Sequence, residues 1–130
     1  MGNLTPSKDQ LNELTNSNYK GPVVMVNLLK FKRVDGKTNE SYKSYQKYMH
    51  KTAPFLKKVN GKLIYIGELA QVFIGDDSDN WDLCLLVKYP SGKAFIEMIT
   101  DQEYLKIQNY RENSLENSAL LVTKPTIGNL

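Results

Sequence analysis

Residues 22–31 read PVVMVNLLKF, and this stretch decides the fold. Apolar residues, three of them the β-branched Val23, Val24 and Val26, occupy both alternating positions, which is typical of a central strand buried on both faces. One face carries Val24, Val26 and Leu28, and the other carries Val23, Met25, Leu29 and Phe31. We therefore expect a strand over 22–31 in the middle of a sheet.

The flanking residues predict one helix on each side of this strand. Thr5 followed by Pro6 favours a helix start, with the helix over about residues 6–15. After the turn at 34–37, Asn39 can cap a helix over about residues 40–58. Because proline lacks an N–H and crowds the preceding turn, we expect a kink or a restart between Thr52 and Pro54.

The second half of the chain predicts three strands and two helices. Strands are expected at 62–69 and 81–89, with extension or pairing through 71–75 as an alternative for the first. Ser91 caps a helix to about residue 99, and a capping box of Thr100 and Glu103 opens another that places Arg111 and Leu115 on one side. The last strand is expected at 119–125.

This order of elements indicates an α+β fold. Strand, helix, two strands, helix and strand, after an extra amino-terminal helix, form the split βαβ arrangement of ferredoxin-like domains, here a single domain over residues 1–130. Such a four-stranded antiparallel sheet has helices on one face only. Because the strands carry apolar residues on both faces, the second face of the sheet should be covered too. The simplest cover is a second copy of the same sheet, related by a two-fold axis. We expect a homodimer.

Composition excludes several classes of site. The chain has 130 residues with one His and one Cys, so no internal disulfide can form, and a metal centre or a Ser-His-Asp triad would depend on His50 alone. We therefore predict neither a metal nor a cofactor. No apolar run approaches the roughly 18 residues of a membrane helix, and no secretion signal is evident. A soluble cytoplasmic protein is expected.

A basic stretch over residues 30–62 raises a further hypothesis, polyanion binding. Its helix repeats Lys43, Lys47 and Lys51 at intervals of four, away from the apolar side, which favours a solvated face. The chain contains only two arginines, the residue type that clamps phosphate and reads guanine. Nucleic acid is therefore not expected as a partner.

Several segments resemble one protein family. GPVVMVNLLKF, SYKSYQKYMHKTAPFL, WDLCLLVKYPSGKAF and MITDQEYLKIQNYRENSLENSALLVTKP together are similar to domain of unknown function family 1330, in the dimeric α/β-barrel superfamily. One departure is Asn60-Gly61, where a Gly-Gly pair is expected. The resemblance implies a ferredoxin-like fold that dimerises through its sheets, with a cavity between sheet and helices. The family has no assigned reaction, but the superfamily includes cofactor-independent monooxygenases, haem-degrading enzymes and lactone isomerases.

Two candidate contact types follow from buried polar groups. Asn27 is the polar residue inside VVMVNLL, and burying its amide without partners costs about 1–3 kcal/mol, so it must bond to a ligand, to backbone or to water. Its role as a ligand anchor resembles that of the strand asparagine in the monooxygenases. Arg111 projects beside Tyr104 and needs a carboxylate, for which Glu68 and Asp82 are candidates, or an anionic ligand.

The remaining candidates are weaker. Tyr45 and Tyr65 can line a pocket or pack as core residues. His50 is expected to be exposed, Trp81 to pack at the sheet edge, and Cys84 to be inert. The candidate ligand-binding set is Asn27, Tyr45, Tyr65, Glu68 and Arg111.

These residues support one leading hypothesis and two alternatives. The leading one is a homodimer that binds a small aromatic or carboxylated molecule between sheet and helices, with cofactor-free oxygenation or isomerisation if it is an enzyme. A non-catalytic dimeric module with a filled pocket is the first alternative, and polyanion binding through residues 30–62 is the second. The residues alone do not decide whether the protein is an enzyme.

Overall fold

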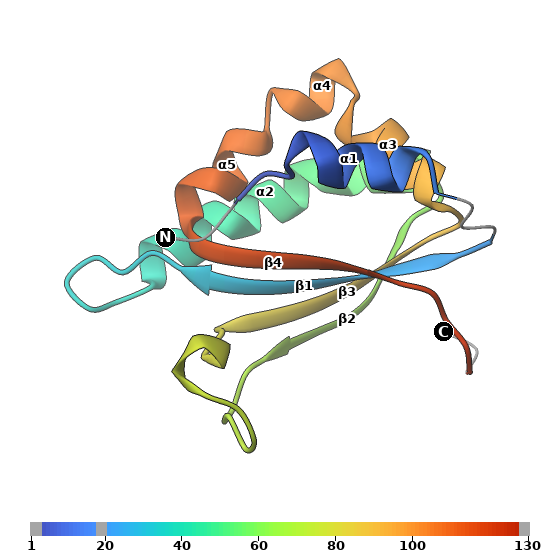
Figure 1. Cartoon of the computed structure of the whole chain (residues 1–130). Helices are drawn as coiled ribbons and strands as arrows, with labels where there is room; N and C mark the ends of the chain where they lie inside the picture. The colour runs from blue at the N-terminus through green and yellow to red at the C-terminus, as the bar shows by residue number, and fades with distance from the viewer. Residues whose placement is uncertain (1–3, 18–20, 128–130) are drawn as a thin grey trace.

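A computed structural model gives the structure of the chain and describes residues 4–17 and 21–127 (Figure 1). The elements in chain order are α1 (Lys8–Thr15), β1 (Val23–Phe31), α2 (Asn39–Lys58), β2 (Lys62–Glu68), the short 3-10 helix η1 (Asp77–Asp79), β3 (Leu83–Tyr89), α3 (Gly92–Ile99), α4 (Gln102–Leu105), α5 (Gln108–Ser114) and β4 (Leu115–Thr123).

The strands form one antiparallel sheet in the order β2-β3-β1-β4. Strand β1 is central, as its apolar sequence predicts, and Asn27 stands between Leu85 of β3 and Leu120 of β4. The α-helices, α1 to α5, lie on one side of the sheet (Figure 1). The predicted ferredoxin-like α+β fold with an extra amino-terminal helix is confirmed.

The core lies between the sheet and the helices. Met25, Leu29 and Phe31 of β1 are fully or almost fully buried against this layer. Tyr45 of α2 stacks edge-on against Phe31, with ring centroids 5.7 Å apart. The face of β1 that carries Met25 and Asn27 is therefore the inner face of the sheet.

The opposite face of the sheet, which we call the open face, is not covered by this chain. It carries Val26 and Leu28 of β1, Leu86 of β3, Tyr65 of β2 and Leu121 of β4. Tyr65 is 53% exposed and Leu121 is 51% exposed. Burial of both faces, expected from the strand sequences, therefore does not occur within one chain.

Three predicted helix starts are wrong. The cap of α1 is Ser7 and not Thr5, because Ser7 forms a reciprocal capping box with Gln10. The residue before α2 is Thr38, and Asn39 already lies in the first turn. Asp101, rather than a box of Thr100 and Glu103, caps α4, because its carboxylate accepts the N–H of Glu103 at 2.8 Å.

Other boundaries also differ from expectation. Helix α2 runs through Pro54 without a restart, since this residue is exposed and water can bond the carbonyl that proline leaves unpaired. Residues 71–75 form no strand. Thr100, expected to cap the next helix, lies at the end of α3, where its hydroxyl donates to the carbonyl of Ile96. Strand β4 begins at Leu115, four residues earlier than predicted, and ends at Thr123 before Pro125.

Candidate functional site

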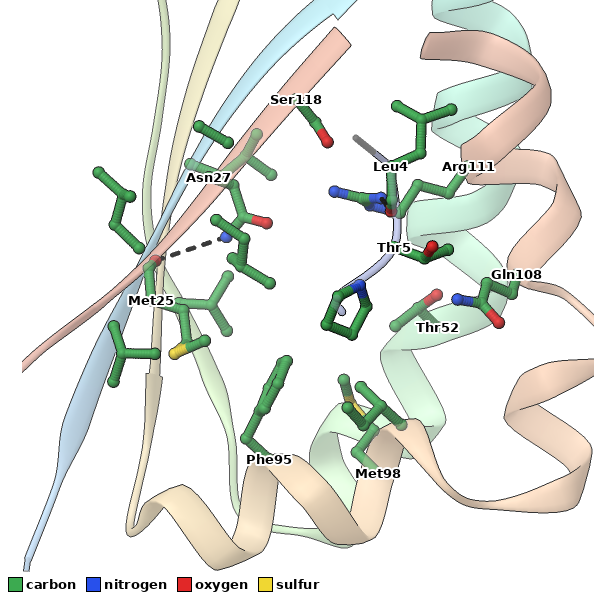
Figure 2. A pocket seen from close by; sticks show the side chains of 18 of the residues that line it. Leu4, Thr5, Met25, Asn27, Thr52, Phe95, Met98, Gln108, Arg111 and Ser118 are labelled. Carbon is green, nitrogen blue, oxygen red and sulfur yellow. Dashed lines mark hydrogen bonds between the residues drawn. The ribbon is translucent and has the colours of Figure 1, made fainter. Parts of the chain in front are cut away.

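A cavity of about 1030 Å³ lies between the inner face of the sheet and the helices (Figure 2). Its walls come from all four strands, from α2, α3, α4 and α5, and from the segment of residues 4–14 that includes most of α1. The sheet supplies apolar side chains such as Met25, Leu85 and Val87, and α3 supplies Phe95 and Met98. Most of the wall is therefore apolar.

Arg111 is the buried cation of this cavity. Its side chain comes from α5, it is only 8% exposed, and it lines the cavity. Its Nη1 donates a hydrogen bond to the carbonyl oxygen of Leu4 at 3.0 Å. Among residues 4–17 and 21–127, no carboxylate lies within ion-pair distance of its guanidinium.

The ion pair expected for Arg111 is therefore not formed. Asp82 instead pairs with Arg33, with Oδ1 2.9 Å from Nη2, and its other oxygen accepts the N–H of Phe31 at 2.8 Å. Glu68 is exposed at the end of β2 and does not line the cavity. Arg111 therefore lines the cavity without an ion pair to the part of the chain that the structure describes.

Four tyrosines line the cavity: Tyr45 and Tyr48 from α2, Tyr89 from β3 and Tyr104 from α4. Burial raises the pKa of Tyr45 above its ordinary value, and the nearby Arg111 opposes the rise. Burial likewise raises the pKa of Tyr89 and of Tyr104. These three phenols are therefore protonated at neutral pH and can donate hydrogen bonds, but they are poor bases.

Three further polar side chains line the cavity with unused hydrogen-bonding groups. Asn27 makes only a long bond, from Nδ2 to the carbonyl oxygen of Met25 at 3.4 Å, so its side-chain oxygen accepts no bond in the described structure. Within the same described ranges, the hydroxyl of Thr52 is buried and has no partner, and the side chain of Gln108 makes no hydrogen bond. Figure 2 shows Thr52 and Gln108 together beneath Arg111, across the cavity from Asn27.

Sequence reasoning missed Thr52 and Gln108, although helical spacing gives a signal for both. Gln108 precedes Arg111 by three residues, and Thr52 follows Tyr48 by four, so each shares a helix face with a residue that lines the cavity. The structure brings Asn27, Tyr45 and Arg111 of the predicted set to one cavity. That these residues bind a ligand stays a prediction.

Tyr65 is placed elsewhere, on the open face. The register between β2 and β3 shifts between Leu63 and Tyr65, so Leu63 pairs with Val87 of the inner face and Tyr65 with Leu86 of the open face. Its ring lies over Gly67, where an added Cβ would clash with it. The structure does not bring Tyr65 to the other candidates.

Three other predicted residues have defined surroundings. His50 is exposed on α2 beside Lys43, Lys47 and Lys51, as expected. Trp81, expected to pack at the edge of the sheet, lines the cavity and is partly exposed. Cys84 is partly buried on the open face, and burial raises the pKa of its thiol.

The described residues lack two kinds of feature. Residues 4–17 and 21–127 contain no group of three or more His, Cys, Asp or Glu side chains arranged to hold a metal ion. Within the same ranges, no helix has the length and the apolar character that crossing a membrane requires.

Comparison with solved structures supports the fold. A protein of unknown function from Rhodopseudomonas palustris is 28% identical, with a TM-score of 0.83 and coverage of 98% of this chain and 100% of that one. A dimeric protein of unknown function with a ferredoxin-like fold from Bacteroides fragilis is 14% identical (TM-score 0.56; coverage 82% and 98%). A cofactor-independent oxygenase from Streptomyces nogalater is 16% identical (TM-score 0.53; coverage 82% and 95%).

Two further comparisons concern the sequence. No curated protein matches the chain. The family model described as "Domain of unknown function (DUF1330)" matches residues 33–125, which begin just after β1 and include every later element. On this match over most of its length, the chain belongs to the DUF1330 family.

Proposed function

We propose that this protein is a cytoplasmic homodimer that binds a small aromatic or otherwise apolar carboxylate in the cavity between sheet and helices, with Arg111 as the anion anchor. The observation that carries the proposal is the burial of Arg111 at this cavity, without a carboxylate partner in the described structure. A free reduced cysteine, Cys84, is consistent with the cytoplasm.

The energetics of a buried cation support an anionic ligand. Removing a charge from water costs several kcal/mol, and protein interiors compensate this cost by pairing the charge. Arg111 donates a hydrogen bond to the carbonyl of Leu4 and also interacts with the phenol of Tyr45, and a guanidinium offers five N–H donors. A carboxylate matches the remaining planar fork with two parallel bonds, which a water molecule cannot do.

The rest of the cavity favours an apolar body on the ligand. Its volume is at the upper end of the range for small-molecule sites, which are mostly apolar with a few converging polar groups. Phe95 and Met98 project toward Met25 across the cavity (Figure 2). An aromatic ring between these side chains would gain both apolar contact and sulfur–aromatic contact.

Binding is better supported than base catalysis. Of the residues described, Glu13 is the only carboxylate that lines the cavity, and His50 is outside it. The buried tyrosines Tyr45, Tyr89 and Tyr104 keep their protons because burial raises their pKa. Oxygenation or isomerisation without a cofactor normally begins with removal of a substrate proton, and the likeness to the Streptomyces oxygenase concerns the fold alone.

Dimerisation would explain the open face. Tyr65 and Leu121 expose apolar surface on its two outer strands, β2 and β4, and a copy related by a two-fold axis would cover both. The neighbour from Bacteroides fragilis, which has the same fold, is described as dimeric.

The ligand proposal is tested with benzoate, phenylacetate and 3-phenylpropanoate, each paired with its neutral amide. We expect at least one acid to raise the melting temperature and its amide to raise it less. Arg111→Met should weaken binding of that acid by about 2–5 kcal/mol. Arg33→Met, which removes the other arginine, leaves the cavity intact and should bind the acid as the wild type does. Equal binding of acids and amides, or acid binding that survives Arg111→Met, would reject the anchor.

A further inference from the structure

The amino-terminal segment of residues 4–17, which includes α1, forms a wall of the cavity. Leu4, Thr5 and Pro6 line it, as do Leu11 and Leu14 of α1. Figure 2 shows Leu4 and Thr5 beside Arg111, opposite the strand that carries Asn27. A ligand that occupies the cavity would therefore lie against this segment.

This segment is held weakly. No residue of α1 is buried, and only Leu4, Leu11, Leu14 and Ser17 of residues 4–17 are even partly buried. Leu14 packs against Gly92 of α3. The two are so close that a Cβ added to Gly92 would lie 3.1 Å from Cδ1 of Leu14. Elements with few buried apolar contacts open at low free-energy cost while the core remains folded.

The segment is also connected to the candidate anchor. The carbonyl oxygen of Leu4 accepts the Nη1 hydrogen bond of Arg111, across 107 positions of sequence. This bond uses one of the five N–H groups of the guanidinium, and the phenol of Tyr45 is a second neighbour of the same side chain. The edge formed by Nε and Nη2 is the candidate site for a carboxylate. Arg111 can therefore hold the segment and a bound anion at the same time.

We propose that residues 4–17 are a lid on the ligand cavity, which opens to admit the carboxylate and closes over it through the bond between Arg111 and the Leu4 carbonyl. This inference rests on the proposed function, since it concerns the same cavity and the same arginine. A carboxylate on the guanidinium fixes the direction of Nη1 and so favours the closed lid. A neutral ligand does not fix the orientation of the guanidinium, so it should favour the closed lid less than a carboxylate does.

Hydrogen exchange of the full chain tests the lid, first without a ligand. Amides of α1 should exchange at least about tenfold faster than those of the central strand β1, because the lid opens without global unfolding. Saturating benzoate should then slow the exchange of α1 several-fold, and benzamide should slow it less. Exchange of α1 at the rate of β1 in the empty protein would overturn the proposal, whether or not any acid binds.

A matched pair of variants separates the lid from its surroundings. Leu14→Ala removes the contact with Gly92, so α1 should exchange faster and benzoate should associate and dissociate faster. Leu105→Ala, at an exposed leucine of α4 that does not line the cavity, should change neither rate. Unchanged exchange and unchanged benzoate rates in Leu14→Ala would reject the lid.

The two proposals fail in different ways. If benzoate binds and depends on Arg111 but leaves the exchange of α1 unchanged, the lid is wrong and the anchor stands. If no acid binds in an Arg111-dependent manner, the proposed function is wrong, and fast exchange of α1 in the empty protein would then show only a mobile helix. That outcome would also overturn the coupling of the lid to an anion.

Discussion

Tyr48 and Tyr104 join two helices inside the protein through their phenol oxygens, which lie 2.7 Å apart. Tyr48 comes from α2 and Tyr104 from α4, both are buried, and both line the cavity. One hydroxyl donates to the other, so each has a hydrogen-bond partner in a wall that is otherwise mostly apolar.

This pair predicts a non-additive pattern of stability. Tyr48→Phe or Tyr104→Phe leaves one buried hydroxyl unpaired and should lower the free energy of unfolding by about 1–2 kcal/mol. The double variant leaves no unpaired hydroxyl and should cost less than the sum of the two single changes. Urea unfolding of the four proteins measures the coupling, and strict additivity would show that the two hydroxyls do not depend on each other.

The buried tyrosines predict a loss of stability at alkaline pH. Burial raises the pKa of Tyr45, Tyr89 and Tyr104, so these groups keep their protons in the folded state when the unfolded chain loses them near pH 10. Below that pH both states are protonated and stability is unaffected. Above it the folded state binds more protons, so the free energy of unfolding falls by up to about 1.4 kcal/mol per pH unit for each tyrosine.

Urea unfolding between pH 8 and pH 11 measures this slope. Tyr104→Phe should make the decline above pH 10 shallower by the contribution of one tyrosine. A free energy of unfolding that stays constant from pH 9 to pH 11 would contradict the burial argument.

Thr52 predicts a substitution that does not destabilise. Its hydroxyl is buried without a partner in the described structure, so Thr52→Val, which keeps the shape, should leave stability unchanged or raise it by about 1 kcal/mol. Ser44→Ala is the matched control on the same helix, because Ser44 donates to the carbonyl of Tyr110 at 3.1 Å and should lose about 1 kcal/mol. Equal losses in both variants would mean that the Thr52 hydroxyl is bonded after all.

Much of the fold can be predicted from local sequence because its signals are periodic. The apolar run of β1 specifies a central strand, and the alternation of apolar and lysine positions in α2 specifies a helix and the side that it buries. Helix starts were harder, because Thr5, Ser7, Thr100 and Asp101 are all acceptable caps, and only the backbone geometry chooses among them.

The candidate site was predicted less well because it depends on pairings between distant residues. A two-residue spacing places Leu63 and Tyr65 on one face of a regular strand, but the register shift between them turns Tyr65 to the open face. Asp82 is a candidate partner for Arg111 in the sequence, but Arg33, in the turn after β1, lies next to Asp82 and forms the ion pair with it. Neither the register shift in β2 nor the pairing of Asp82 with Arg33 rather than Arg111 produces a periodic pattern in the sequence.

The open face predicts how the dimer can be separated. Leu121 of β4 stands beside Val26 of β1 on this face and is 51% exposed, so a dimer formed through the sheets would bury it. Leu121→Glu would place a carboxylate in that apolar contact, where desolvation is costly, and should convert the dimer to a monomer. Leu105→Glu introduces the same charge on the helical side and should leave the dimer intact. Light scattering at micromolar concentration measures both, and a monomeric wild type, or a dimeric Leu121→Glu, would show that the sheets do not form the interface.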